Sequence, residues 1–420
     1  MASTAPMTDS IRTRWVQLGL GLIVMMAISS PQYVWTLFVK PLQAATGASL
    51  PQIQITFSIL IVLQTWLSPA QGWLVERFGP RLLVALGAAL SGLGWVLASS
   101  VTDLTALFLT YGLLCGVGTG IVYIGIVGLM ARWFPDRRGL AIGMVAAGYG
   151  MGALVTTFPI DSMIKAEGHA HTLTVFGLLL GAVGVLAALG LRTPRTTERL
   201  PAPRAQVVTG RDTSPGAMVK TPVFWLMFLM MTMMSTGGLM ATSNFASFAR
   251  DFGVADMLVL GMAALPLALT VDRILNGFTR PFFGWVSDHI GRENTMGLAF
   301  LLEGLAILLL LTFRDNAVAF VLLSGLVFFG WGEIFSLFPS TLTDTFGTRQ
   351  ATTNYGLLYM SQGIGSVLGG PVAAAIRGVA GSWVPVFSLV IAMDVLTALL
   401  ALFVLKQMRR RYLAGQVSAV

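Results

Sequence analysis

Charged residues are scarce in this chain of 420 residues: Asp, Glu, Lys and Arg make up 10% of it, against roughly 25% in a soluble globular protein. A soluble enzyme of this length would need more polar surface than these residues supply. Hydrophobic residues make up 55% of the chain, which also contains 47 glycines. Glycine is more frequent in transmembrane helices than in soluble ones. The composition therefore predicts an integral membrane protein.

Cysteine and histidine are scarce as well, with one Cys and three His in the chain. Cys115 lies inside an apolar run, whereas His169, His171 and His289 lie in connecting segments. These residues provide neither a disulfide framework nor a cluster with metal-ligand spacing. The sequence predicts no metal site and no cofactor, and it argues against redox and zinc chemistry.

The net charge of +8 would be compatible with nucleic acid as a partner, because basic patches attract phosphate. Nearly all of the 26 Lys and Arg residues, however, lie in short segments between apolar runs of helix-spanning length. We therefore expect no nucleic acid, and the partner that the sequence predicts is the lipid bilayer.

Apolar runs long enough to cross a membrane occur twelve times, since about 20 apolar residues span a hydrocarbon core of roughly 30 Å. The run that begins at Trp15 is too long for a cleavable signal peptide. The predicted spans are 15–39, 53–75, 82–101, 104–131, 139–163, 172–192, 222–249, 258–286, 295–313, 316–343, 351–376 and 381–405.

A long polar break at 193–221 separates six spans from the other six. It is rich in Pro, Thr and Arg, so we expect a flexible linker. The expected domains are an N-terminal six-helix bundle at 1–192 and a C-terminal six-helix bundle at 222–420.

Lys and Arg in the connecting segments predict the orientation, because cytoplasmic loops are enriched in these residues. With the N-terminus in the cytoplasm, 19 of them lie on the inner side and five on the outer side. We expect a multi-pass protein of the cell (plasma or inner) membrane that functions as a monomer, with the linker and both termini in the cytoplasm.

An internal repeat relates the two halves of the chain. GWLVERFGPR at 72–81 and GWVSDHIGR at 284–292 share the spacing of Gly-Trp, an acid and a second Gly at an offset of 212 residues, and an Arg closes each segment. Two glycines of the fifth span recur in the eleventh at an offset of 213, namely Gly143, Gly152, Gly356 and Gly365. Two six-helix halves with the same orientation are predicted, as in transporters with parallel repeats.

The paired segments resemble the signature loop of the major facilitator superfamily, and the resemblance covers essentially the whole chain. It implies an all-α membrane protein whose twelve transmembrane helices form two pseudo-symmetric six-helix bundles that rock about a central cavity. It also implies a cytoplasmic gate formed by Glu76, Arg77, Arg81, Asp288 and Arg292. The first segment departs from the family pattern, since Glu76 replaces the usual Asp and Pro80 precedes the arginine.

Three ionisable residues lie inside the eighth span, where charge is costly: Asp272, Arg273 and Arg280. At 100° per residue, these three and Asn276 project into one sector of about 100°, which we expect to face the cavity. A carboxylate can bind the guanidinium group of an arginine in a bidentate geometry. Asp272 is about 12 Å of helix rise from Arg280, which is too far for a direct contact. We expect Arg280 to bind an anionic substrate, while Arg273 either joins it or pairs with an acid on another helix.

Polar and aromatic residues of other spans are candidates for the rest of a small-anion pocket. Each of them alone is more often packed in a core or exposed to lipid. They are Ile28, Gln32, Tyr33, Tyr123, Tyr149, Trp331, Phe335, Tyr359 and Gln362.

Four segments resemble the oxalate/formate antiporter family and, more loosely, the monocarboxylate transporters: PQYVWTLF at 31–38, RWFPDRRGLAIGMVAAGYGMG at 132–152, NGFTRPFFGWVSDHIGR at 276–292 and FGWGEIFSLFPS at 329–340. The antiporter resemblance implies that Arg280 binds the substrate within an aromatic wall made by Tyr33, Tyr123, Tyr149, Trp331 and Tyr359, with Gln32 beside it. The antiporter family also has a lysine in the eleventh span, where this chain has Gln362.

The missing lysine changes the expected substrate. One fixed positive charge suits one carboxylate, and a second buried carboxylate would suffer a desolvation penalty of several kcal/mol. The sequence thus favours a monocarboxylate such as lactate, pyruvate or formate. Monocarboxylate transporters place an acid where this chain has Asn276, so Asp272 and Glu333 are the candidate proton carriers. We expect Glu303 and Asp394 to be peripheral or packing acids.

Proton-coupled transport of monocarboxylates is the first functional hypothesis, and anion exchange on the same fold is the second. A membrane enzyme or channel is disfavoured, because we find no nucleophile–base pair, no metal-ligand set and no phosphate loop. GVGTG at 116–120 is ordinary glycine packing inside a span. A cavity arginine also disfavours export of cationic drugs, while a receptor without transport stays open.

Overall fold

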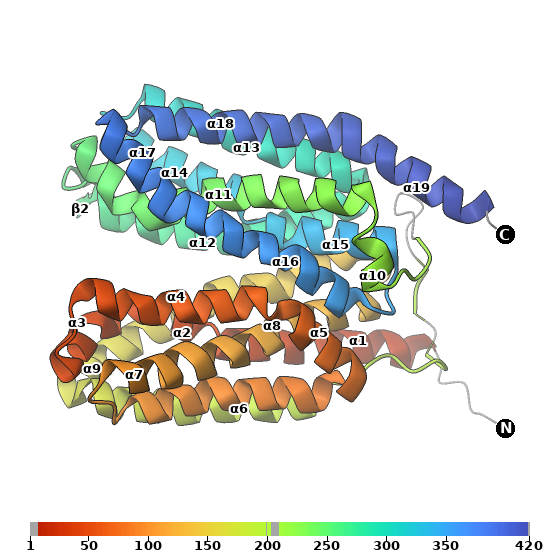
Figure 1. The fold of residues 1–420 in the computed structure, drawn as a ribbon, viewed down its shortest axis with the longest axis horizontal. Helices are drawn as coiled ribbons and strands as arrows, with labels where there is room; N and C mark the ends of the chain where they lie inside the picture. The colour runs from red at the N-terminus through yellow and green to blue at the C-terminus, as the bar shows by residue number, and fades with distance from the viewer. Residues whose placement is uncertain (1–6, 199, 203–209, 419–420) are drawn as a thin grey trace. The chain divides into compact units, whose positions relative to one another are not determined.

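The computed structural model describes residues 7–198, 200–202 and 210–418, and most of them are helical. The described residues contain one small sheet, in which β1 (Leu258–Val259) pairs antiparallel with β2 (Met262–Ala263). The predicted all-α class is confirmed. Figure 1 shows the long helices of each half running side by side.

Helices of the first half follow one another with short breaks. They are α1 (Met7–Ala27), α2 (Ser30–Tyr33), α3 (Trp35–Thr46), α4 (Leu50–Trp66), α5 (Ser68–Phe78), α6 (Pro80–Ala98), α7 (Leu104–Leu107), the π-helical η1 (Phe108–Leu114), α8 (Cys115–Trp133) and α9 (Arg138–Leu189).

The second half repeats this pattern after a short helix in the linker. Its helices are α10 (Pro215–Met218), α11 (Pro222–Asp251), α12 (Ala264–Ile290), α13 (Arg292–Thr312), α14 (Ala317–Trp331), α15 (Ile334–Phe346), α16 (Ala351–Val367), the π-helical η2 (Leu368–Val372), α17 (Ala373–Ala380), α18 (Val384–Leu399), the π-helical η3 (Leu400–Leu405) and α19 (Lys406–Ser418).

Within the described residues, nine helices are long and apolar enough to cross a membrane, and the pair α4–α5, bent by 53°, raises the number to ten. The fifth and sixth predicted spans together form α9, which is broken at Gly168 (φ 84°, ψ 166°). A straight helix of 52 residues would be about 78 Å long, far more than one hydrocarbon core. α9 therefore contains two spans, joined where glycine adopts a positive φ.

The remaining predicted span is α12, a helix of 27 residues that is less apolar because Asp272, Arg273 and Arg280 lie within it. Its predicted start at residue 258 is wrong, since residues 258–263 form the hairpin of β1 and β2. Leu260 and Gly261 have positive φ values of 53° and 79° in its turn. A short apolar run does not distinguish a hairpin from a helix by composition.

The chain folds into two compact units that differ slightly from the predicted bundles. Unit 1 consists of Met1–Asp136, Met144–Ala202 and Thr348–Tyr359. Unit 2 consists of Arg137–Gly143, Pro203–Gly347 and Met360–Val420. Each unit thus includes a short segment from the other half of the sequence, and the helices α9 and α16 contribute to both units.

Close approach of glycines allows the helices of unit 1 to pack tightly. A Cβ added at Gly118 of α8 would lie 2.4 Å from the carbonyl oxygen of Gly87 in α6. A Cβ added at Gly92 of α6 would lie 2.6 Å from the carbonyl oxygen of Gly177 in α9. Any larger residue at Gly118 or Gly92 would push these helices apart.

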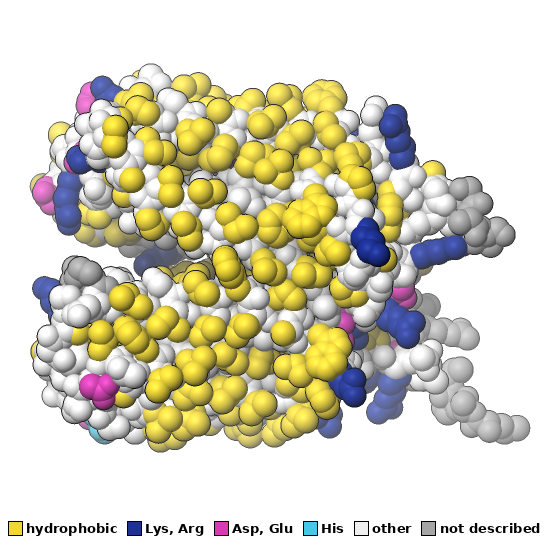
Figure 2. Space-filling model, in the orientation of Figure 1, with side chains coloured by type: hydrophobic (Ala, Val, Ile, Leu, Met, Phe, Trp, Pro, Cys, Tyr) yellow, Lys and Arg dark blue, Asp and Glu magenta, His cyan; other side chains and the backbone are white. Residues whose placement is uncertain are grey.

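The surface of each unit suits a hydrocarbon environment. Figure 2 shows apolar side chains over the middle of the helices and Lys and Arg toward their ends. Large apolar residues are exposed in both units, including Phe158 and Leu186 in unit 1 and Leu322 and Phe403 in unit 2. A soluble protein rarely exposes contiguous apolar surface of this kind.

The predicted linker at 193–221 is held in place over part of its length. Arg192 Nη2 lies 2.5 Å from Glu198 Oε1. The backbone N–H of Gly210 donates to the carbonyl of Asp344, and that of Thr213 donates to Phe346, each at 2.8 Å. Residue 199 and residues 203–209, which include the basic residues Arg199 and Arg204, lie outside the described residues.

Candidate functional site

Four tyrosines of unit 1 form one cluster: Tyr33 of α2, Tyr123 of α8, Tyr149 of α9 and Tyr359 of α16. Tyr149 meets Tyr33 and Tyr123 edge-to-face, with ring centroids 5.4 Å and 5.2 Å apart. Tyr123 stacks on Tyr359 with centroids 5.1 Å apart. The structure thus brings together the four predicted wall residues that lie in this unit.

Two glutamines bind the hydroxyl groups of this tyrosine cluster. Tyr149 Oη donates to Gln32 Oε1. Gln64 Nε2 donates to Tyr149 Oη at 3.2 Å and to Tyr359 Oη at 3.5 Å. Gln64 is buried and was not predicted, although a glutamine inside the second span was a usable signal. Ile28 is also buried in unit 1.

Arg280 of α12 is the centre of the polar groups in unit 2, and 2% of it is exposed. Its Nη2 donates to Asn276 Oδ1 at 2.9 Å, one helical turn earlier. Its guanidinium carbon lies 4.5 Å from the ring centroid of Phe335, a cation–π geometry. Phe335 in turn meets Trp331 edge-to-face at 5.7 Å. These contacts fix the orientation of the guanidinium group.

Close backbone packing fixes the helix that carries Arg280. A Cβ added at Gly143 would lie 2.2 Å from the carbonyl oxygen of Arg280. A Cβ added at Gly332 would lie 2.7 Å from the carbonyl oxygen of Asn276. Glycine is therefore required on both sides of this part of α12, and the close contacts fix the helix backbone at Arg280.

The four residues of α12 that are predicted to project into one sector differ in burial. Asp272 and Arg280 are buried and Asn276 is half-buried, but Arg273 is exposed. The angular argument places Arg273 and Arg280 on one face, yet they are two helical turns apart. Burial depends on what packs at each height along the helix, which the angle does not describe.

Gln362 stands where the antiporter resemblance would have a lysine, and it is buried. Ser235 Oγ of α11 donates to Gln362 Oε1 at 2.8 Å. The helices meet closely here, since a Cβ added at Gly365 would lie 2.5 Å from Ser235 Cβ. The eleventh predicted span therefore contributes a neutral amide to unit 2.

Three further acids are fully buried in unit 2: Glu303 of α13, Glu333 between α14 and α15, and Asp394 of α18. Of the two alternatives expected for Glu303 and Asp394, burial excludes a peripheral position and agrees with acids packed between helices. Apolar helices in a single sequence give no sign of which face meets another helix, so partners on different helices could not be recognised.

Glu76, a predicted gate residue of unit 1, caps the start of α16. Its Oε1 accepts hydrogen bonds from the backbone N–H groups of Thr352 and Thr353 at 2.9 Å and 3.1 Å. A carboxylate at a helix N-terminus is stabilised by the unpaired N–H groups and by the helix dipole. Arg132 Nη2 lies 3.6 Å from Glu76 Oε1 and donates to the carbonyl of Arg349.

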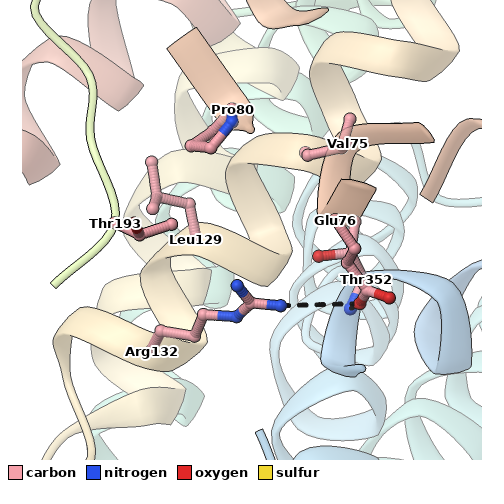
Figure 3. A pocket seen from close by; sticks show the side chains of 8 residues that line it. Val75, Glu76, Pro80, Leu129, Arg132, Thr193 and Thr352 are labelled. Atoms are coloured by element: carbon pink, nitrogen blue, oxygen red, sulfur yellow. Dashed lines mark hydrogen bonds and ion pairs between the residues drawn. The ribbon is translucent and has the colours of Figure 1, made fainter. Parts of the chain in front are cut away.

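A crevice in unit 1 contains both Glu76 and Arg132, as Figure 3 shows. The two side chains approach each other from α5 and α8, and Thr352 of α16 lies beside them. The remaining lining residues are Val75, Pro80, Gly125, Leu129 and Thr193.

Asp288 repeats the role of Glu76 in unit 2. Its carboxylate accepts from the backbone N–H groups of Gly139 and Leu140 at 3.1 Å and 3.0 Å, at the start of α9. Arg292 donates to Asp288 at 2.7 Å and to Asp344 at 2.8 Å. The repeated sequence segments therefore make equivalent helix caps, on α16 in unit 1 and on α9 in unit 2.

Two predicted gate residues lie elsewhere. Arg81 Nε donates to the carbonyl of Leu191 at 3.2 Å, and Arg77 lies over the ring of Trp73 at 5.3 Å. Sequence reasoning instead missed Arg132, Arg138 and Asp344, of which Arg138 and Asp344 form a buried ion pair. The basic segment RWFPDRRG was visible, but it does not show which arginine binds which acid.

Among the described residues, no group of three or more His, Cys, Asp or Glu side chains has a geometry that could hold a metal ion. The two clusters therefore offer different chemistry. Unit 1 provides neutral hydroxyl and amide groups on aromatic walls, and unit 2 provides a fixed guanidinium group beside buried acids.

Comparisons with known proteins agree with this architecture. A family model described as Major Facilitator Superfamily matches residues 18–276 and 265–416. The chain is 35% identical to the oxalate:formate antiporter of Oxalobacter formigenes, over 97% of this chain and 95% of that protein. It is 27% identical to monocarboxylate transporter 13 of Bos taurus, over 79% of this chain and 75% of that protein. The fold resembles a crystal structure of the transporter FucP in the outward conformation, with a TM-score of 0.67, 15% identity, and coverage of 96% of this chain and 99% of that one.

Proposed function

The chain belongs to the Major Facilitator Superfamily and is a multi-pass membrane transporter, and we propose that it carries small monocarboxylates such as lactate, pyruvate or formate in symport with protons. Transport would follow the alternating-access scheme, in which the substrate site opens to one side of the membrane at a time. In unit 2, the substrate is bound by Arg280 and oriented by Asn276 and Gln362. The tyrosine cluster is the proposed substrate-binding wall of unit 1.

The observation that carries this proposal is the environment of Arg280. Arg280 is 2% exposed, so its charge is held in the interior of unit 2. Its Nη2 donates to the neutral amide oxygen of Asn276 at 2.9 Å, and its guanidinium carbon lies 4.5 Å from the ring centroid of Phe335. Arginine binds carboxylates in a planar, bidentate geometry, which makes it the natural anchor for such an anion.

The neutral amide of Gln362 supports a substrate with one carboxylate. Gln362 accepts a hydrogen bond from Ser235 and contributes no charge to balance a second carboxylate. Binding a dianion at one guanidinium group would leave one charge unbalanced, at a cost of several kcal/mol. The monocarboxylate transporter among the relatives is consistent with this choice.

We also propose that the termini and the linker are cytoplasmic, because 19 of the Lys and Arg residues then lie inside and five outside. Glu76, Asp288 and Arg292 form the cytoplasmic gate on this proposal, since both acids cap the start of another helix. Opening the gate would expose those N–H groups to water, which can replace the carboxylates.

The direct test uses proteoliposomes that contain the purified full chain. Radiolabelled lactate should accumulate inside when the outer solution is made acidic, and collapse of the pH gradient should release it. Unlabelled pyruvate and formate should compete, and oxalate should compete at least about tenfold less well. Failure of lactate to enter under any gradient would refute monocarboxylate transport.

A second candidate function is carboxylate exchange, favoured by the 35% identity to an oxalate:formate antiporter. An exchanger moves labelled substrate into vesicles that are preloaded with unlabelled substrate, without any pH gradient. If lactate enters only preloaded vesicles and a pH gradient has no effect, the chain is an exchanger and the symport proposal is wrong.

A further inference from the structure

Three carboxylates from different helices lie together in unit 2, in a group that we call the acid triad: Glu303, Glu333 and Asp394. Each residue has 0% of its surface exposed. None of their six carboxylate oxygens has a hydrogen-bond partner among the described residues. Buried charges without partners are very costly in a low-dielectric interior, so this arrangement needs an explanation.

Glycines allow two members of the acid triad, Glu303 and Asp394, to approach each other. A Cβ added at Gly330 of α14 would lie 2.7 Å from Glu303 Cβ, and one at Gly304 of α13 would lie 3.3 Å from Asp394 Cβ. On α11, a Cβ at Gly237 would lie 3.5 Å from Asp394 Oδ1 and 3.7 Å from Glu303 Oε1. The oxygens of Glu303 and Asp394 therefore lie around one point on α11.

A buried donor lies at the same turn of α11. Trp331 is 6% exposed, and its Nε1 has no hydrogen-bond partner among the described residues. A Cβ added at Gly238, the residue after Gly237, would lie 2.2 Å from this nitrogen. Trp331 also contacts Phe335, which lies under Arg280. The indole of Trp331 thus contacts α11 next to Gly237 on one side and the ring of Phe335 on the other.

The guanidinium group of Arg280 lies over the ring of Phe335, two residues after Glu333 in the chain. The charge of Arg280 acts on Glu333, and the three acids of the triad act electrostatically on one another. Two acids of α12 are also buried. Asp272 lies toward Gly325 of α14, and Asp288 lies near the end of α12, where Arg292 binds it. Apart from the exposed Arg273, the remaining charged residues of the helices packed around the triad lie near helix ends: Arg250, Asp251, His289, Arg292, Glu293 and Asp344.

One positive charge stabilises at most one carboxylate, so the other members of the acid triad must carry protons. Two carboxylates that share a site cannot both ionise easily, and one holds a proton over a wide pH range. Among the described residues, no group of three or more His, Cys, Asp or Glu side chains could hold a metal ion, and this includes the acid triad. Protons are therefore the ligands that this cluster fits.

We propose that the acid triad is the proton-binding site of the transporter and that Glu333 couples it to the substrate. Without substrate, ionised Glu333 is stabilised by the charge of Arg280. When a carboxylate binds Arg280, that stabilisation is shared with the substrate, and a proton from the same aqueous side binds a carboxylate oxygen of Glu333. Glu303 and Asp394 are protonated at rest and relay protons to and from Glu333. The proton is released with the substrate on the other side, so one proton accompanies one anion.

This inference rests on the proposed carboxylate transport, and it replaces Asp272 as the main candidate for the proton carrier. The test uses full-length chains in proteoliposomes with radiolabelled lactate, and it compares accumulation driven by a pH gradient with counterflow into preloaded vesicles. Counterflow needs no net proton movement, so it reports substrate binding and the conformational change alone.

The variants are Glu303→Gln, Glu333→Gln and Asp394→Asn, each of which keeps the shape of a protonated acid. We expect gradient-driven accumulation to fall about tenfold or more in each, while counterflow stays within about threefold of the parent. Asp315→Asn, at a side chain that is 88% exposed, is the matched control and should change neither assay. Asp272→Asn should retain accumulation.

Accumulation at the parental level in all three triad variants would overturn the inference, as would its loss in Asp272→Asn alone. For any variant that does not fold, proton uptake by the unmodified chain replaces the transport assay. Calorimetry of lactate binding in buffers with different ionisation enthalpies should give about one proton taken up per lactate. A value near zero would also overturn the inference.

The outcomes separate this inference from the proposed function. If the unmodified chain neither binds nor moves lactate, monocarboxylate transport is wrong and the inference falls with it. If the chain exchanges lactate but never accumulates it under a pH gradient, carboxylate transport stands and the proton site alone is wrong.

Discussion

The predicted spans of the two halves differ in where they hold charge. In the first half, the charged residues lie at or near the ends of the spans. The second half holds six deep in its spans: Asp272, Arg273, Arg280, Glu303, Glu333 and Asp394. The tyrosine cluster of unit 1 satisfies its hydroxyl groups with glutamine amides, whereas the acid triad of unit 2 leaves its oxygens without hydrogen bonds among the described residues.

This contrast indicates that the two halves of the chain, which share one architecture, have different functions. Neutral polar groups inside a membrane are inexpensive when they bind one another, but charged groups there are costly and are retained for function. Charge recognition and proton binding are therefore expected in unit 2. Unit 1 is expected to supply shape and neutral hydrogen bonds.

The largest effect is expected at Arg280. Arg280→Ala should weaken lactate binding by about 2–5 kcal/mol, which is roughly 30-fold or more, because it removes the proposed counter-charge of the anion. Arg280→Lys keeps the charge but loses the bidentate geometry, and should recover only part of the affinity. The measurement is the dissociation constant from calorimetry in detergent.

Arg273→Gln is the matched control, since Arg273 lies two turns away on the same helix and is exposed. We expect its dissociation constant for lactate to stay within about threefold of the parent. An equal loss of lactate affinity in the Arg273 and Arg280 variants would contradict the proposed anchor. It would show that the overall positive electrostatic potential of unit 2 attracts the anion, and not Arg280 alone.

Adding a charge to the second unit should change the substrate class. Gln362→Lys should strengthen oxalate binding about tenfold relative to lactate, because a second cation balances the second carboxylate. Competition between oxalate and labelled lactate measures this ratio. Gln362→Met, which is similar in size but uncharged, should show no such shift. Oxalate binding that is equally weak in both variants would contradict the argument from charge.

Removing a hydroxyl from unit 1 should have a smaller effect. Tyr149→Phe keeps the ring but leaves Gln32 and Gln64 without their partner. We expect lactate binding to weaken by about 1 kcal/mol, a factor of roughly five. Tyr111→Phe is the control, because its hydroxyl donates to the carbonyl of Pro31 at 2.8 Å. It should lower thermal stability with little change in binding, and the reverse pattern would count against the tyrosine cluster.

The smallest effect is expected from a charge pair of unit 1 that lies outside the spans. The hydrogen bonds from Arg192 lower the pKa of Glu198, so the pair stabilises the fold at neutral pH and loses this contribution as the pH falls through the lowered pKa. Glu198→Gln should cost no more than about 1 kcal/mol at neutral pH. Thermal unfolding should show the difference from the parent shrinking on acidification. A difference that grows instead would contradict this assignment.

Features that depend on residues close together in the sequence could be predicted, and features that depend on distant residues could not. Apolar runs located all twelve predicted spans, because span length is set by the thickness of the bilayer. The repeat at 72–81 and 284–292 located the helix caps made by Glu76 and Asp288. A residue pair on one helix, such as Asn276 and Arg280, was also within reach, because helical geometry alone places them together.

Contacts between distant helices were out of reach. Gln64 and Tyr149 are 85 positions apart, and neither residue type indicates the other. The acid triad combines three predicted spans, each of which contains one acid and no sign of its partners. The exposure of Arg273 could not be predicted for the same reason, since it depends on the neighbours of α12 and not on α12 itself.

The hydrogen bonds at the end of the linker indicate where the chain can be split into two separately expressed halves. Besides the contacts of Gly210 and Thr213 with α15, the backbone N–H of Arg211 donates to Gln416 Oε1 of α19 at 2.8 Å. Residues from Gly210 onward thus belong structurally with the second half. If the halves are expressed as two polypeptides, the second should begin before Gly210, so that it keeps these hydrogen bonds at its N-terminal end.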